Sequence, residues 1–160
     1  MKFRTLVKAT AFAAAFALGA AGVAQAATLH LHNGGDPRSL DPQRVSGNWE
    51  DRPVSDYIEG LMTLDAKGGA ILGQAASYSV SDDGLVYTFK LRDDAMWSDG
   101  EPVVAEDFVL GLQRLEDPAT AAEYAYPQYS IDNAEATNSG ENPHRNELGP
   151  TAIDDTTGQI

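Results

Sequence analysis

The stretch LRDDAMWSDGEPVVAEDFVLGLQRLEDP, residues 91–118, decides the fold. A predicted strand ends at its start, Asp99-Gly100 forms a tight turn, and Pro102 fixes the entry into a predicted helix. Trp97 is expected to pack the strand end against this helix, which Asp117-Pro118 terminates. One apolar stripe at helical spacing defines the buried face of the helix: Ala105, Phe108, Val109, Leu112 and Leu115. The stretch is therefore interpreted as scaffold.

The segments before this stretch predict further strands and a helix. Residues 76–81 and 85–91 are strand-like and flank Asp82-Asp83-Gly84, which is typical of a hairpin turn. Leu85, Tyr87, Phe89 and Leu91 share one face of the second strand. Apolar residues at helical spacing predict a helix over residues 54–64. The alternating run TLHLH, residues 28–32, predicts a short strand.

The pattern becomes less regular after the predicted helix. Residues 121–129 are rich in tyrosine, and residues 133–150 are interpreted as a polar linker. The last ten residues, 151–160, predict a strand, a turn and the beginning of a second strand. An unfinished hairpin arm would leave backbone groups unpaired, so we interpret the chain as a fragment of a longer protein.

The first 26 residues have the pattern of a cleaved signal peptide. Basic residues open the segment, residues 9–23 are small or apolar, and Ala24-Gln25-Ala26 predicts cleavage before Ala27. The apolar run is shorter than the roughly 20 residues of a membrane-spanning helix. No cysteine follows the cleavage site, so no lipid anchor is expected. We expect a periplasmic protein with no membrane insertion after cleavage.

Composition limits the classes of partner. The chain has 24 acidic against 11 basic residues and a net charge of −13, which argues against nucleic acid and anionic membranes as partners. Most of these carboxylates are interpreted as a solvated surface. The absence of cysteine means that stability must come from a packed core rather than from disulfides.

No residue pattern indicates catalysis or a cofactor. His30 and His32 fall on one face of their predicted strand, but a structural zinc site needs four ligands, so no metal is expected. Paired aspartates occupy turn-like places, no serine has the setting of a nucleophile, and Gly34-Gly35 is no phosphate loop. The tyrosines at 124, 126 and 129 have two open interpretations: a recognition surface or the cover of an inter-lobe surface. We predict that the protein is not an enzyme.

Several motifs occur in a specific order: S-L-D-P at 39–42, E-G-L at 59–61, YTFKLRDDAMWSDGEPVVAEDFV at 87–109, Q-R at 113–114 and D-P-A-T-A at 117–121. In this order the chain resembles the family 5 extracellular solute-binding proteins, the oligopeptide- and dipeptide-binding components of ABC importers. The resemblance covers most of residues 29–132. It implies an α/β fold of the two-lobed periplasmic binding protein type with an extra packed domain, of which this chain holds only the N-terminal portion.

The resemblance also implies a domain plan and a function. Residues 27–58 would form the first segment of ligand-binding lobe 1, and residues 59–160 an incomplete extra scaffold domain. The protein would act as a monomer that captures oligopeptides by lobe closure and delivers them to the membrane permease subunits of an ABC transporter. Within the family, the alternative ligands are dipeptides, nickel chelates, haem, opines and sugars. Outside it, the alternatives are a peptide-holding chaperone and an acidic hydrolase.

Ligand contacts follow from the resemblance at four positions. Ser46, Gly47 and Asn48 match the segment that runs beside a bound peptide and hydrogen-bonds its main chain, and Tyr124 matches an aromatic residue that lies against the peptide. Relatives often have threonine where Val104 stands. Valine cannot cap the helix that follows, and such a loss costs about 1 kcal/mol.

Overall fold

The computed structural model describes residues 28–142 and 144–160. The predicted signal peptide, residues 1–26, lies outside these residues. Residues 28–32 have no regular secondary structure, and Leu29 and Leu31 are 78% and 84% exposed. The strand predicted for TLHLH is therefore wrong. A strand requires a neighbour for its backbone groups, and within the described ranges no strand pairs with this segment.

Helix α2 spans Asn48–Tyr57, so the helix predicted over residues 54–64 is wrong at both ends. Gly47 is the extended N-cap residue, and the Glu50 carboxylate accepts its N–H at 3.1 Å, which fixes the start of the helix. Pro53 lies inside the helix and cannot donate to the Trp49 carbonyl. That carbonyl accepts a hydrogen bond from the Asn33 side chain instead.

Strands β1 (Met62–Leu64) and β2 (Ala70–Leu72) form an antiparallel hairpin. Oδ1 of Asp65 accepts the N–H groups of Lys67 and Gly69 at 2.7 and 2.8 Å, which closes the turn. Leu61 and Met62 fit a helical period, but Met62 belongs to this hairpin and Leu61 directly precedes it. The turn chemistry around Asp65 prevails over the helical spacing.

A second sheet has four antiparallel strands in the order β3-β4-β6-β5. Two predicted hairpins are confirmed. The one over residues 76–91 is formed by β3 (Ala75–Val80) and β4 (Tyr87–Leu91). The one over residues 151–160 is formed by β5 (Thr151–Asp154) and β6 (Thr157–Gln159). Strand β6 pairs with β4, where Thr88 faces Gln159. Phe89 and Leu91 are buried, whereas Leu85 and Tyr87 are exposed, so the predicted apolar face is buried only at its C-terminal half.

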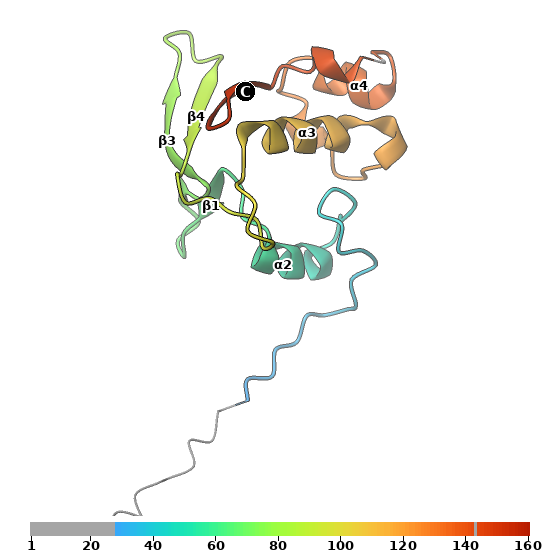
Figure 1. Ribbon diagram of the computed structural model, residues 1–160. Coiled ribbons are helices and arrows are strands. Elements are labelled where there is room, and N and C mark those ends of the chain that lie inside the picture. Colours follow the sequence, from blue (N-terminus) through green and yellow to red (C-terminus); the bar gives the residue numbers. More distant parts are fainter. Residues whose placement is uncertain (1–27, 143) are drawn as a thin grey trace, which may run out of the picture. The chain divides into compact units, whose positions relative to one another are not determined.

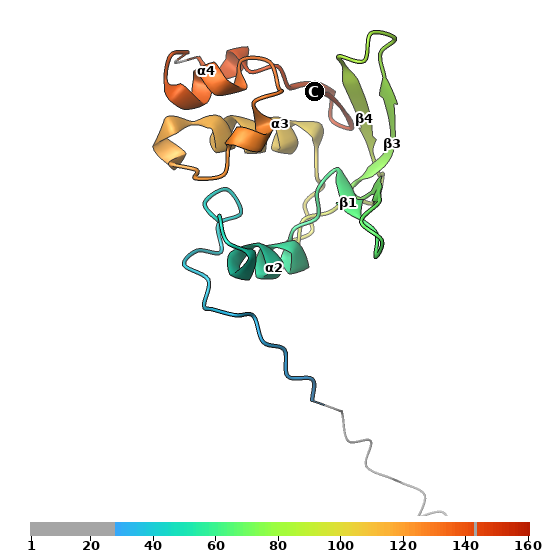
Figure 2. The ribbon, with the colours of Figure 1, turned by 180° about the vertical axis from the view of Figure 1, so that it is seen from behind.

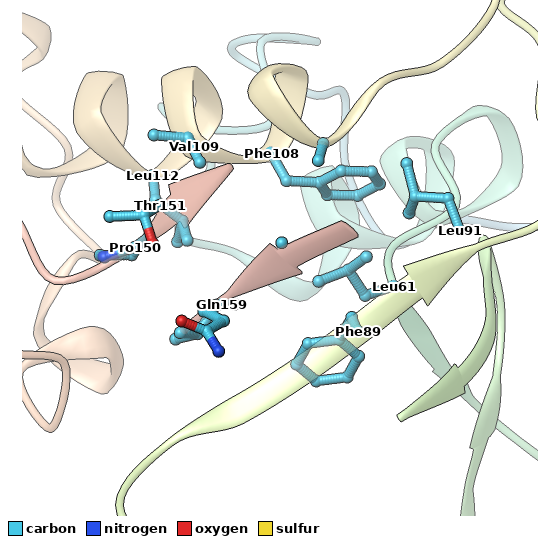
Figure 3. Close-up of a pocket in the computed structure, with 12 residues that line it drawn as sticks. Leu61, Phe89, Leu91, Phe108, Val109, Leu112, Pro150, Thr151 and Gln159 are labelled. Atoms are coloured by element: carbon cyan, nitrogen blue, oxygen red, sulfur yellow. The ribbon is translucent and has the colours of Figure 1, made fainter. Parts of the chain in front are cut away.

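Helix α3 (Ala105–Glu116) packs on β5 and β6 of this sheet (Figure 1). The predicted stripe faces the sheet, with Ala105 and Val109 buried and Phe108 and Leu112 beside them. Figure 3 shows Phe108, Val109 and Leu112 on the helix side, and Phe89 and Leu91 on the strand side, of an apolar cavity of about 20 Å³. A cavity of this size holds at most a single water molecule, which would need polar partners. It is a packing gap of the core.

Asp107, in the first turn of α3, binds the backbone of the N-cap residue Val104. Asp107 Oδ2 accepts the N–H of Val104 and the indole N–H of Trp97, both at 3.0 Å. The predicted contact of Trp97 with this helix is thus confirmed, although its ring is half exposed. The side chain of Val104 forms no cap hydrogen bond, so the Asp107 carboxylate supplies only the reciprocal half of a capping box, and it also fixes the indole.

Residues 118–150 contain short helical segments: η1 (Pro118–Thr120), η2 (Tyr126–Gln128), α4 (Ala134–Ser139) and η3 (Arg145–Glu147). The polar linker predicted over residues 133–150 is therefore wrong. Ala134 and Thr137 are fully buried, and α4 lies alongside α3 in both views (Figures 1 and 2). Among the helices of the described ranges, none is long and apolar enough to cross a membrane.

Arg114 of α3 joins two of the sequence motifs. Its guanidinium forms a bidentate ion pair with Asp41, in which Nη1 donates to Oδ1 at 2.9 Å, and this pairing lowers the pKa of Asp41. Gln43 Nε2 donates to the Gly111 carbonyl at 2.6 Å. The S-L-D-P segment is thereby fixed to the helix, and the chain that follows it is directed toward α2.

We expect Arg114→Lys to destabilise the protein by about 0.5–1 kcal/mol, because lysine keeps the charge but loses the planar fork that binds both carboxylate oxygens. Urea unfolding measures the change. Arg52→Lys is the control, since Arg52 forms no ion pair among the described residues. Equal stability of the two variants would show that the fork contributes nothing.

Candidate functional site

The structure brings the four predicted ligand residues together around one hollow of about 210 Å³. Ser46, Gly47 and Asn48 contribute the start of α2, and Tyr124 comes from the loop after η1. The lining is completed by Pro42, Val45 and Asp51. Sequence reasoning missed these last three. Asp51 was detectable, because it lies three residues after Asn48 and so on the same side of the first helical turn.

The Glu50 carboxylate holds the segment at the start of α2. Its Oε2 accepts the N–H groups of Ser46 and Gly47 at 3.0 and 3.1 Å, and its Oε1 accepts the backbone N–H and Nε of Arg38, both at 3.0 Å. Glu50 has no exposed surface. The Arg38 guanidinium, followed by the backbone donors, lowers the pKa of Glu50 to about 2. A buried charge is tolerable only with such partners.

These bonds decide which polar groups are free to meet a ligand. The backbone N–H groups of Ser46 and Gly47 are occupied by Glu50. Asn48 is the first residue of α2, so its N–H has no acceptor within the helix. In the described part of the chain, the backbone N–H and the side-chain amide of Asn48 have no hydrogen-bond partner, whereas the Tyr124 hydroxyl bonds that of Tyr126 and thereby raises the pKa of Tyr126. Of the three residues of this segment expected at the ligand, Asn48 is therefore the one with a main-chain N–H left to offer.

The Ser46 side chain connects the two sides of the hollow. Its hydroxyl accepts a hydrogen bond from Arg38 Nη2 at 2.9 Å and donates one to Glu123 Oε2 at 2.7 Å. Arg38 Nη2 also lies 3.6 Å from Glu123 Oε2. The Ser46 hydroxyl, with Arg38, lowers the pKa of Glu123. Segments 77 positions apart are joined in this way.

The three tyrosines of residues 124–129 have separate environments. Tyr124 lines the hollow, and its ring contacts that of Tyr126 edge-on, with centroids 4.9 Å apart. Tyr129 donates its hydroxyl to Asn138 Oδ1 at 2.8 Å and is therefore tied to α4. Of the two interpretations left open for these tyrosines, a recognition surface fits Tyr124, because this ring alone of the three lines the hollow.

The paired aspartates occupy turns, as predicted. Asp83 Oδ1 accepts the N–H of Leu85 at 3.1 Å, and Asp154 Oδ1 accepts the N–H of Thr156 at 2.8 Å. Across residues 28–142 and 144–160, no three histidine, aspartate or glutamate side chains converge as metal ligands. His30 and His32 lie in the irregular segment at residues 28–32. The carboxylates of Asp83 and Asp154 thus stabilise backbone turns of the scaffold.

A family model matches residues 71–157, more than half of the chain. It describes bacterial extracellular solute-binding proteins, family 5, middle region. The chain is 40% identical over 157 residues to the periplasmic oligopeptide-binding protein OppA of Salmonella typhimurium, covering 97% of this chain and 28% of that protein. It is 41% identical to the probable deoxycholate-binding periplasmic protein YgiS of Escherichia coli, over 82% of this chain and 25% of that one.

The solved structures that the chain resembles are of the same kind of protein as these relatives. The crystal structure of Haemophilus influenzae OppA in complex with RPPGFSPFR matches with a TM-score of 0.76 and 42% identity, over 80% of this chain and 25% of that one. The unliganded open form of the murein tripeptide-binding protein MppA matches with a TM-score of 0.73 and 40% identity, over 78% of this chain and 24% of that one.

The fold and the hollow at the start of α2 thus define an α/β protein of the periplasmic binding protein class. The chain belongs to the bacterial extracellular solute-binding proteins of family 5. It spans about a quarter of the length of the curated relatives that it matches.

Proposed function

We propose that this chain contributes one wall of the ligand site of a periplasmic peptide-binding protein that serves an ABC importer. The observation that carries the proposal is the convergence of Ser46, Gly47, Asn48 and Tyr124 on one hollow. The names of the OppA relatives and the peptide in the Haemophilus structure support peptide as the ligand class. Residues 27–58 and 59–160 would serve as lobe segment and scaffold domain.

The hollow suits a ligand that is recognised by its main chain. The Asn48 side-chain amide can donate to a peptide carbonyl and accept from a peptide N–H, while its backbone N–H offers a second donor. The Tyr124 ring offers a rigid contact surface with a polar tip. Main-chain recognition is independent of side-chain identity, which an importer of varied peptides requires.

Transport would require two states of the whole protein. Ligand binding would favour the closed lobes, because a ligand shifts only an equilibrium between states that it binds unequally. The closed form would then be the one recognised by the permease subunits. In this proposal the protein is monomeric, periplasmic and free of catalysis. The support for the last point is that the carboxylate pairs of the described residues are used in turns.

The second candidate ligand is a non-peptide solute. It is favoured by the 41% identity to a relative whose name specifies deoxycholate, a steroid acid. An aromatic wall formed by Tyr124 would contact such an apolar ligand as readily as a peptide. The two candidates differ in the polar groups that they offer to Asn48.

Native mass spectrometry of the full-length protein, purified gently from its own source, tests the proposal. We expect adducts with the masses of short peptides. Adducts with the mass of a steroid acid would show that the ligand is the second candidate, a non-peptide solute, and not a peptide. A ligand-free protein that binds neither peptide nor steroid acid in calorimetry would contradict both.

Tyr124→Ala is expected to weaken the binding of tetra-alanine about tenfold, since loss of a well-placed aromatic contact costs on the order of 1–2 kcal/mol. Calorimetry on the full-length protein gives the dissociation constant. Tyr87→Ala is the matched control, because Tyr87 is comparably exposed but lies on β4 and does not line the hollow. An unchanged dissociation constant in Tyr124→Ala would remove this residue from the site.

A further inference from the structure

Arg38, Ser46 and Glu123 form a hydrogen-bonded link, the Ser46 link, at the edge of the hollow that Ser46 lines. The Ser46 hydroxyl uses its one hydrogen on Glu123 and accepts from Arg38. Its backbone N–H is bound to Glu50. A ligand therefore finds no donor at Ser46, and this residue must serve the site in another way.

The loop that carries Tyr124 has few other attachments. It begins after Ala121, whose left-handed backbone (φ 52°) closes η1. Ala125 is buried and anchors the far end of the loop. Of residues 122–124, Glu123 is joined to distant parts of the described chain by the Ser46 link, whereas Tyr124 contacts Tyr126, two residues further along the same segment. Tyr124 directly follows the residue that this link holds.

We infer that Glu123 is a positioning residue for the ligand site: held by Ser46 and Arg38, it fixes Tyr124 over the start of α2. The inference rests on the proposed function for its effect on binding. It assigns Ser46 the same indirect role, in place of direct ligand contact. Asn48 and Tyr124 are then the groups that touch the ligand.

The energetics distinguish this role from general stabilisation. The side chains of Arg38 and Glu123 are 60% and 62% exposed, and exposed ion pairs add little to global stability. Loss of the Ser46 link therefore leaves the fold intact. A locally tethered loop has a low opening free energy of its own, so the same loss releases Tyr124. The predicted signature is weaker binding without a matching loss of melting temperature.

The test uses Glu123→Ala, Ser46→Ala and the double variant in the full-length protein. Two quantities are measured: the NMR signals of isotope-labelled tyrosine rings, and the affinity for tetra-alanine by calorimetry. Glu141→Ala is the matched control, because Glu141 is exposed and forms no hydrogen bond or ion pair within the described residues. Glu123→Gln is the conservative variant, since its amide oxygen can still accept from Ser46.

We expect the Tyr124 signals to shift in the same way in both single variants and the affinity to fall about fivefold in each. The double variant should be no weaker than the weaker single one, because both substitutions break the same bond. Glu123→Gln should recover part of the affinity. Melting temperatures should stay close to that of the control.

Unchanged Tyr124 signals in Glu123→Ala would overturn the inference whether or not peptide binds. Shifted signals with unchanged affinity would overturn it as well, since Tyr124 would then move without consequence for the site. Failure of the unsubstituted protein to bind tetra-alanine or any other short peptide would count against the proposed function instead. The ring signals would still decide whether Glu123 positions Tyr124.

Discussion

Glu50→Gln is expected to lower the melting temperature of the protein by on the order of 10 °C. The carboxylate accepts hydrogen bonds on both oxygens, from Arg38 on one and from Ser46 and Gly47 on the other. Glutamine replaces one oxygen with an NH₂ group, which then faces donors. Glu50 is fully buried whereas Arg38 is 60% exposed, so the main loss is that of a buried acceptor for the backbone N–H groups of Arg38, Ser46 and Gly47. Calorimetric or circular-dichroism melting measures the change.

The control for this prediction is Glu106→Gln. Glu106 also lies in the first turn of a helix, α3, but it is exposed. We expect its substitution to change the melting temperature by a degree or two at most, since exposed carboxylates near a helix N-terminus contribute only about 0.3–1 kcal/mol. Equal effects at the two positions would mean that the five hydrogen bonds of the Glu50 carboxylate add nothing beyond the helix-end effect.

The pH dependence gives an independent check of the Glu50 prediction. The folded-state pKa of about 2 lies below the ordinary value of 4.5, so the unfolded chain binds the proton more readily. Stability from Glu50 is therefore complete above pH 4.5, declines as the pH falls from 4.5 to 2, and is absent below. The difference in melting temperature between the protein and Glu50→Gln should shrink over this window. A constant difference would contradict the pairing.

The parts of the fold that the sequence predicts are those with local patterns. The hairpin of β3 and β4 follows from strict alternation around an Asp-Asp-Gly turn, and α3 follows from its apolar stripe. The pairing of β6 with β4 is not local, and one sequence carries no signal for it. Helix α4 is not predicted, because its buried residues, Ala134 and Thr137, are too small or too polar to give an apolar period.

The residues of the site likewise divide into those that the sequence predicts and those that depend on contacts between distant segments. Ser46, Gly47, Asn48 and Tyr124 come from the family resemblance, and the structure places them on one hollow. Glu50 could have been found from the residues alone, because Gly47-Asn48-Trp49-Glu50 has the spacing of a capping box. Glu123 could not, since its partners Ser46 and Arg38 are distant in the sequence.

Glu116, the last residue of α3, presents the opposite case to Glu50. It has no exposed surface, and among residues 28–142 and 144–160 neither carboxylate oxygen has a hydrogen-bond partner. Thr137 of α4, the helix beside it, is also buried with an unpartnered hydroxyl. Nearby charges are engaged elsewhere: Arg145 pairs with Asp117 at 2.7 Å. Burial raises the pKa of Glu116 to about 6, so ionisation of this residue opposes folding at neutral pH.

Glu116→Met is therefore expected to stabilise the protein by about 1–2 kcal/mol at pH 8, because it removes a buried polar group that lacks partners and keeps a good helix former. The folded pKa of about 6 lies above the ordinary 4.5. The cost of ionisation is thus absent below pH 4.5, grows between pH 4.5 and 6, and is constant above.

Urea unfolding of Glu116→Met and of the exposed control Glu106→Met, measured from pH 4 to 8, tests this prediction. The gain should be smallest at pH 4 and reach its full value above pH 6, whereas the control should show no such dependence. A loss of stability at all pH values would mean that the Glu116 carboxylate has a partner in the full-length protein. In that case it is a paired charge like Glu50, and its burial between α3 and α4 contributes to folding.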